Sequence, residues 1–527
     1  KISTPEHNYI RDGFHARTRA EEIKSTDLEL NVLISIENVT DRVNAAVTPG
    51  ASAAEAYAQR RAVIATIEKD SLAKTGLRSD VVTLYQGAEY HLYRYKRYTD
   101  VRLVFAVEQQ AAFFGGDPDN FEFPRYNLDI SLFRAYENGQ PAKITDYLKV
   151  SPRGAAENEL VFVSGNPGAT DRLLTVAELA AHRDSRVPML NAYLKNNEVA
   201  LAAWSARSEE NARRAQDDFL SFQNSRKVYD GRRQTLYDPA FFQKRISEEA
   251  ALQSFAHSRS DLTSVADAWA RVASAQAALT ENYKRQVFLE SRDPTRWPLP
   301  TFESDLLRYG RLLYRLPSER AKPNGDRLRE YRDSAKETLE LDLFSEQPIY
   351  RDLEKLKLTQ FLTLMVEQLG ADDPAVQRVL AGQSPARRAA QLIDGTKLVD
   401  VSFRRKLAVM STDEIEHVDD PVITLMRTID ADARAARRIF EEQTNAKAQA
   451  HADVAKVLYA KYGDSRYPDA TFTLRLSYGT IKGYDEDTGH VAPFTDLAGM
   501  FQRSAEHHGR EPFDLPPHWE SFEKNWI

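Results

Sequence analysis

The chain has 527 residues, of which 42% are hydrophobic and 28% charged, a composition typical of folded globular proteins. Its 71 basic and 78 acidic residues give a net charge of −7, which argues against a dedicated nucleic-acid-binding protein. The absence of cysteine excludes disulfides, thiolate nucleophiles and cysteine-ligated metal sites. No apolar run approaches the roughly 18 residues of a membrane span, so no transmembrane helix is predicted.

Residues 28 to about 170 are predicted to be rich in β-strands, because short apolar and β-branched runs alternate there with turns. An exception is the alanine-rich segment 51–70, which is predicted to be a helix beginning after Ser52. Several short strands joined by turns fit a barrel or a sandwich. The predicted strands lie at 28–36, 81–85, 90–95, 101–107, 128–136 and 160–164.

From about 176 to 462 the apolar residues recur at helical spacing, which predicts a large helical domain. Strands return at 471–478, and the segment 483–489 is predicted to be a turn. The order β, long α, β is most simply read as a helical block inserted between two β parts. The predicted domains are therefore an N-terminal β part at 1–175, a helical domain at 176–462, and the start of a second β part at 463–527.

The sequence carries none of the common nucleophile-elbow, zinc-protease or nucleotide-binding motifs in a credible context. No metal site is predicted, because the adjacent histidines His507 and His508 point their side chains apart. The densest group of polar residues lies within 113–136, where two glycines are followed by Asp117, Asp119 and Asn120 among aromatic residues. Glycines permit backbone conformations that other residues avoid, so this segment is predicted to be a tightly turned loop.

Asp129 follows this loop in a predicted strand, on the face opposite Leu128, Ile130 and Leu132. Such an aspartate either pairs with an arginine, faces water, or orients a histidine as in serine-protease triads. The turn Ser164–Gly168 leaves another predicted strand. It is either a plain strand-to-helix turn or a wall close to a ligand.

These two segments resemble the S46 family of bacterial dipeptidyl peptidases. Gly115–Arg125 reads Gly-Gly-Asp-x-Asp-Asn-Phe-x-Phe-Pro-Arg and leads into 128–136, as a similar loop in that family leads into a strand bearing the triad aspartate. Ser164–Gly168 is similar to the family's Gly-x-Pro-Gly-x-Thr segment. The segments 3–14 and 36–43 and the β, α, β order also look like this family, so the resemblance covers most of the chain.

The resemblance implies an α+β fold, a chymotrypsin-like double β-barrel with a large inserted all-helical cap domain. It implies a serine exopeptidase that removes dipeptides from the free N-termini of peptides. Asp129 matches the triad aspartate, and Asn120 matches the residue that holds the α-ammonium of the substrate. Phe121 stands beside that amine where the family more often has tryptophan, and a phenylalanine ring attracts a cation less strongly than tryptophan does.

Neither the family's catalytic histidine segment nor its catalytic serine segment is found in these 527 residues. The family places the first just before residue 1 and the second soon after residue 527, so we expect the sequence to be part of a longer or truncated enzyme. The alternatives are a non-catalytic relative that binds peptide N-termini, and a helical scaffold with β ends that docks partners.

The resemblance further implies oligopeptides with free N-termini as partners, no cofactor, and no nucleic acid. It also implies export to the periplasm or cell surface of a bacterium, and a possible homodimer. The preferred dipeptides are not indicated by these residues.

Overall fold

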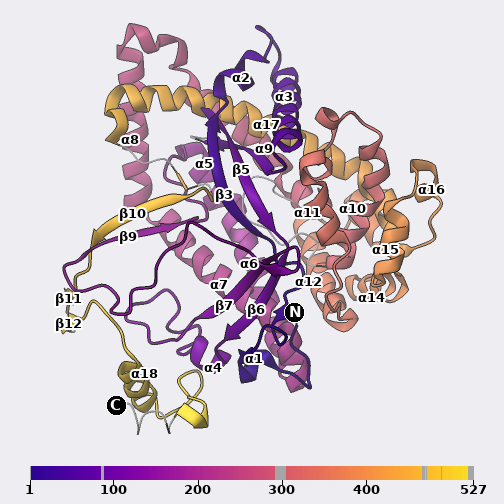
Figure 1. The fold of residues 1–527 in the computed structure, drawn as a ribbon. Coiled ribbons are helices and arrows are strands. Elements are labelled where there is room, and N and C mark those ends of the chain that lie inside the picture. The colour runs from indigo at the N-terminus through magenta and orange to yellow at the C-terminus, as the bar shows by residue number, and fades with distance from the viewer. Residues whose placement is uncertain are drawn as a thin grey trace. The chain divides into compact units, whose positions relative to one another are not determined.

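A computed structural model of the chain describes residues 2–84, 88–290, 304–465, 469–470, 472–487, 489–519 and 521 (Figure 1). Tyr85 and Thr471, at the ends of two predicted strands, lie outside the described residues. The chain divides into two compact units. Unit 1 comprises Lys1–Asn31, Arg97–Pro167 and Phe472–Ile527, and unit 2 comprises Val32–Lys96 and Gly168–Thr471.

Unit 1 is built on a five-stranded antiparallel sheet in which β6 pairs with β1, β2 and β7, and β7 pairs with β8. Val101 lies opposite Ala135, and the register between β6 and β7 shifts after Leu103. The strands are β1 (Phe14–His15), β2 (Ile23–Lys24), β6 (Asp100–Ala106), β7 (Ser131–Glu137) and β8 (Gln140–Pro141).

Two antiparallel ribbons complete the described strands of unit 1. One pairs β9 (Leu160–Gly165) with β10 (Arg475–Thr480), and the other pairs β11 (Tyr484–Glu486) with β12 (Gly489–Val491). The turn predicted at 483–489 was therefore too simple, because it contains most of the second hairpin. The helices of unit 1 are α1 (Tyr9–Asp12), α4 (Gln109–Ala112) and α18 (Leu497–Glu506).

The strand predicted from residue 128 begins only at Ser131. The backbone N–H of Leu128 donates instead to the carbonyl of Ala111 in α4, at 3.0 Å, and that of Ile130 donates to Leu128. These two bonds turn the chain away from a strand ladder over the first three predicted positions. The alternation of apolar residues correctly predicted a strand from residue 131 onward, but the alternation alone does not show where pairing with β6 starts.

Unit 2 contains most of the three-stranded sheet β3–β5–β4, of which residues 30–31 and 97–98 are counted with unit 1. Its strands are β3 (Leu30–Asn38), β4 (Arg78–Leu84) and β5 (Glu89–Tyr98), and its neighbouring helices are α2 (Thr40–Ala45) and α3 (Ala53–Thr75). The helix predicted after Ser52 is confirmed. Ser52 and Glu55 form a reciprocal capping box at its start, and Gly76, at φ +67°, ends it.

The helices predicted between 176 and 462 are present, from α5, capped by Thr175, to α17, which ends at Tyr462. They are α5 (Val176–Ala181), α6 (Val187–Ser205), α7 (Glu209–Tyr237), α8 (Pro239–Ser258), α9 (Ala268–Arg285), α10 (Asp305–Arg320), α11 (Lys336–Leu343), α12 (Arg351–Leu369), α13 (Pro374–Leu380), α14 (Pro385–Gly395), α15 (Val401–Ala408), α16 (Thr412–Glu416) and α17 (Pro421–Tyr462). The long helix α17, drawn in orange, packs along α9 and α10 (Figure 1).

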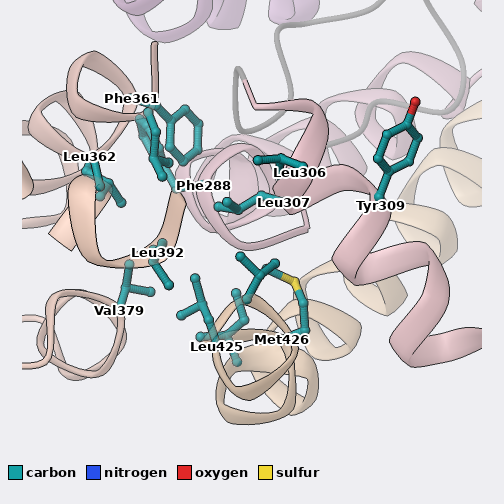
Figure 2. Close-up of a cluster of buried hydrophobic side chains, with 14 of the residues drawn as sticks. Phe288, Leu306, Leu307, Tyr309, Phe361, Leu362, Val379, Leu392, Leu425 and Met426 are labelled. Atoms are coloured by element: carbon teal, nitrogen blue, oxygen red, sulfur yellow. The ribbon is translucent and has the colours of Figure 1, made fainter. Parts of the chain in front are cut away.

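The main core of unit 2 lies where α10, α12, α14 and α17 meet (Figure 2). The rings of Phe288 and Phe361 pack against each other at a tilt of 53° with centroids 5.4 Å apart, and Leu307, Leu392 and Met426 complete the cluster. All five side chains are almost completely shielded from solvent. Burying each large apolar side chain contributes about 1.5–3 kcal/mol, so this cluster is a principal source of stability for the helices.

The predicted combination of helices and sheets is confirmed. Within the described ranges no sheet closes into a barrel, because every sheet has free edge strands. The double β-barrel and the boundaries of the three predicted domains stay predictions. The grouping of Val32–Lys96 with the helices reflects the packing of α3 against α17 and against the segment 324–335.

Candidate active site

The loop that follows β6 and α4 in unit 1 carries two of the three predicted site residues. Its base is anchored by Phe114, which has no exposed surface and meets Phe513 edge to face at 5.9 Å. Met500 of α18 and Trp519 belong to the same apolar cluster. Aromatic packing from a distant part of the sequence therefore holds the loop from beneath.

Two glycines allow the loop to turn sharply. Gly115 and Gly116 have φ angles of +79° and +51°, a region that side chains disfavour. A Cβ atom on Gly115 would lie 2.5 Å from Oδ2 of Asp119, and one on Gly116 would lie 2.8 Å from Cβ of Pro512. Glycine is required here both for the backbone angle and for the space.

Asp119 is fixed at the centre of the loop by an ion pair with Arg503 of α18. The Nη2 and Nε atoms of Arg503 donate to the two carboxylate oxygens at 2.7 and 3.2 Å. Asp119 is only 3% exposed, and its backbone N–H donates to the carbonyl of Gly115 at 3.1 Å. The hydrogen bonds to Asp119 raise the pKa of Arg503, so the guanidinium stays charged and the loop stays tied to α18.

The side chain of Asn120, next in the chain, is half-buried. Its Oδ1 atom accepts a hydrogen bond from Nη1 of Arg125 at 3.0 Å, and its backbone N–H donates to the carbonyl of Asp117. The guanidinium of Arg125 lies over the ring of Phe113 at 5.2 Å. A carboxamide oxygen can accept two donors, so this contact orients the amide.

The side chain of Phe121 is exposed to solvent rather than packed in the interior. Its backbone has φ +69°, an unusual value for an aromatic residue, and its side chain is 63% exposed. The strained turn directs a large apolar ring away from the cluster that anchors the loop. An exposed ring beside an oriented amide oxygen is a suitable environment for an organic ammonium group.

Asp129 lies two residues before the first residue of β7 and is exposed. Over the part of the chain that the structure describes, no hydrogen bond or ion pair engages its side chain. Of the alternatives weighed from the sequence, an aspartate facing solvent matches this arrangement. Its predicted role in a triad stays a prediction, as do the roles of Asn120 and Phe121.

β7 itself is held by the buried carboxylate of Glu22. Tyr136 Oη and Arg134 Nε donate to it at 2.7 and 2.8 Å. Burial alone would raise the pKa of Glu22, but these two hydrogen bonds outweigh it and leave the pKa lowered. The hydrogen bond to Glu22 raises the pKa of Tyr136. The neutral hydroxyl of Tyr136 therefore donates to the charged carboxylate of Glu22 and holds β7 in place.

Two residues that position the site were not singled out from the sequence. Arg125 was part of the quoted motif, but nothing in the pattern indicated that it orients Asn120. Arg503 lies some 380 positions from Asp119, and only tertiary structure brings them together. Among the described residues no cluster of histidines and carboxylates could hold a metal ion, and no helix has the length and apolarity to cross a membrane.

Chemically, the loop combines an orientable amide oxygen, an exposed aromatic face and a rigid, charge-compensated base. This arrangement can bind a primary ammonium and discriminate against a blocked amine, which lacks the charge. It supplies no nucleophile by itself.

Comparison with known proteins agrees with this picture. The sequence model of the Peptidase S46 family matches residues 1–526. Dipeptidyl-peptidase 7 of Capnocytophaga gingivalis is 26% identical over 99% of the chain and 74% of its own length. An Asp/Glu-specific dipeptidyl-peptidase of Shewanella putrefaciens is 27% identical over 97% of the chain and 70% of its own length.

A solved structure, Porphyromonas endodontalis DPP11 in complex with the dipeptide Arg-Glu, is similar in fold. It superposes with a TM-score of 0.73 at 19% identity, covering 99% of the chain and 76% of its own. A second structure of the same protein, in complex with Arg-Asp, gives a TM-score of 0.72.

Proposed function

The chain belongs to the Peptidase S46 family, and from this premise we propose that it forms part of a serine exopeptidase that releases dipeptides from free peptide N-termini. The family predicted from the motifs is confirmed, and so is the class of enzyme, a peptidase with dipeptidyl-peptidase relatives. The finer assignments below are proposals about the residues of unit 1.

The observation that carries the proposal is the loop of Asn120 and Phe121. The amide oxygen of Asn120 accepts the α-ammonium of the substrate, and the exposed ring of Phe121 lies beside it. The bond from Arg125 keeps the oxygen aimed while the pair of Asp119 and Arg503 holds the backbone beneath it. An exopeptidase needs such a fixed point, because it counts residues from the terminus.

Asp129 is proposed to orient a histidine base, which in turn activates a serine. Its exposed carboxylate has no competing partner among the described residues, which leaves it available for this role. The relative with solved structures was crystallised with Arg-Glu and Arg-Asp. Dipeptides ending in an acidic residue are therefore the first substrates to offer this protein.

The double β-barrel is proposed as the finer fold. The proposal is supported by the ribbon of β9 and β10. Four apolar side chains on one face of this ribbon are 54–74% exposed to solvent, namely Leu160, Phe162, Leu476 and Tyr478. A two-stranded ribbon with a bare apolar face is at best marginally stable in water, so it fits a larger β structure better than an isolated hairpin.

The test is hydrolysis of fluorogenic dipeptide substrates, each with a free or an acetylated N-terminus, by the complete enzyme of which we propose this chain to be part. We expect cleavage of the free forms alone. An Asn120→Ala variant should lower kcat/KM by about 10- to 150-fold, because a hydrogen bond to a charged group contributes about 1.5–3 kcal/mol. The Asp129→Ala variant should lower kcat far more than it changes KM.

A matched control is Asn138→Ala, which removes an amide from an exposed turn of the same unit. It should leave hydrolysis unchanged. Equal cleavage of free and acetylated substrates would refute amine recognition, and full activity of Asp129→Ala would refute the triad role. Binding of free N-terminal peptides without turnover would favour the non-catalytic relative instead.

Export to the periplasm or cell surface of a bacterium, and a homodimer, are proposed from the family resemblance. Cell fractionation tests the first, and sedimentation equilibrium of the purified protein tests the second. Recovery from the cytoplasm alone, or a single monomeric mass across micromolar concentrations, would contradict them.

A further inference from the structure

Unit 2 contains a large cavity of about 1390 Å³ whose wall is formed by α2, α3, α9 and α17. It exceeds the roughly 300–1,000 Å³ of typical small-molecule sites. Small side chains leave room in it, since α17 presents alanine at 446, 452, 455 and 460, Gly463 follows the end of α17, and α9 presents Ala275. The cavity lies within one unit and contains none of the residues of the candidate active site.

Arg60 of α3 forms part of this wall, and it is the unusual residue there. It is only 8% exposed, and its Nη2 atom donates to Oε1 of Gln449 at 2.8 Å. Its Nε and Nη1 atoms have no hydrogen-bond partner among the described residues, and solvent does not reach them. A buried guanidinium with unmade hydrogen bonds is costly, so a side chain of this kind normally serves a partner.

The other charges of the cavity are already balanced. Asp453 accepts hydrogen bonds from Arg271 and Lys456, both at 2.7 Å. Glu89 is engaged by the ring of His91 at 2.9 Å. Within the described ranges of the chain, no carboxylate contacts the guanidinium of Arg60.

We propose that this cavity is a second peptide-binding site, in which Arg60 holds a peptide carboxylate. Because a single hydrogen bond tethers its guanidinium, turning into the cavity would give up the bond to Gln449 and offer two unused N–H groups to an anion. A carboxylate accepts such a pair of donors well.

A peptide fits the rest of the wall better than a simple anion does. The side-chain amides of Asn44, Gln443 and Gln449 can donate to and accept from peptide groups. Between them Val47, Leu173 and several alanines offer shallow apolar contacts, which suit small side chains. The ligand class is therefore a short peptide with a free C-terminus, whether a substrate tail or a released product.

The experiment uses peptides that the proposed active site cannot accept. N-acetyl-trialanine with a free carboxylate, and the same peptide as its C-terminal amide, are titrated into the purified protein by calorimetry. We expect saturable binding of the acid, and binding of the amide at least about tenfold weaker, since a charge-assisted contact is lost. Acetylation makes the result independent of the proposed activity.

Three variants sharpen the test. Arg60→Met should reduce the affinity for the acid to that for the amide, whereas Lys74→Met, the same change at an exposed position of α3, should have no effect. Ala455→Phe should weaken binding by filling the cavity from α17 without touching Arg60. Thermal unfolding confirms that each variant is folded.

Equal binding of acid and amide, or no binding of either at millimolar concentration, would overturn the proposal. Arg60 would then be a structural residue. Acetate should compete only weakly. If the affinity of acetate equals that of the acid peptide, the proposal is also overturned, because the site would then recognise any carboxylate rather than a peptide. Activity on free N-terminal substrates that persists in Arg60→Met would show that the two sites are separate.

Discussion

The rigidity of the candidate site depends on Gly115, and replacing it by alanine tests the reasoning most directly. The backbone angle of φ +79° costs a side-chain-bearing residue about 1–2 kcal/mol. In addition, the new Cβ would lie 2.5 Å from Oδ2 and 2.8 Å from Cβ and Cγ of Asp119. Asp119 cannot swing aside cheaply, because Arg503 grips both of its oxygens.

Overpacking of this kind costs about 1–3 kcal/mol more, so Gly115→Ala should destabilise the loop by about 2–5 kcal/mol. Gly139→Ala is a matched control. Gly139 has a similar angle, φ +73°, but no atom lies within 4 Å of its added Cβ, so only the backbone cost of about 1–2 kcal/mol applies. The difference between the two variants isolates the clash with Asp119.

Hydrogen–deuterium exchange followed by mass spectrometry measures this locally, which a global unfolding curve of a two-unit chain would not. Peptides covering 113–128 should exchange faster in Gly115→Ala and unchanged in Gly139→Ala. Hydrolysis of free N-terminal substrates should fall in parallel for Gly115→Ala alone. Equal exchange in the two variants would refute the argument that the loop is tightened around Asp119.

Three further predictions concern the surrounding structure. Arg503→Met should lower the free energy of unfolding of unit 1 by about 3–5 kcal/mol, because it leaves the buried carboxylate of Asp119 without its partner. Chemical denaturation followed by hydrogen exchange in α18 measures this loss. Glu330 has its pKa lowered to about 2, since the hydrogen bonds and charge of Arg437 outweigh its burial. Its ionisation therefore stabilises the fold above pH 4.5, and this stability is lost as the pH falls toward 2, so Glu330→Gln should flatten acid unfolding in that window. An unchanged acid transition would contradict the pairing. Phe361→Ala, in the core of Figure 2, should cost about 3–5 kcal/mol by thermal or urea unfolding of unit 2, and a loss below 1 kcal/mol would mean that the cavity collapses.

Local patterns in the chain were sufficient to predict α3 and the helical region between 176 and 462. Apolar residues at a period near 3.6 and end signals such as Ser52 with Glu55 act within a few residues, so they can be read without the fold. The start of β7 could not be read in this way. It depends on a hydrogen bond between Leu128 and Ala111, which the alternation of side chains does not encode.

The candidate site shows the same division. Asn120, Phe121 and Asp129 were found because they lie in one continuous motif, which also carried the family. The ion pair that holds the loop was invisible in that motif, since Arg503, the partner of Asp119, reaches the loop from α18. The unsatisfied guanidinium of Arg60 likewise emerges only when α3 and α17 are packed together.

The sequence by itself thus determined the coarse order of a β-rich part, a long helical part and returning strands, the family, and the residues proposed for amine binding, because these are properties of contiguous segments. The tertiary structure decided which charges are paired, which glycines have no room for a side chain, and where a cavity is left. Pairing and space depend on residues brought together from hundreds of positions apart, and no local pattern of side chains records those distances.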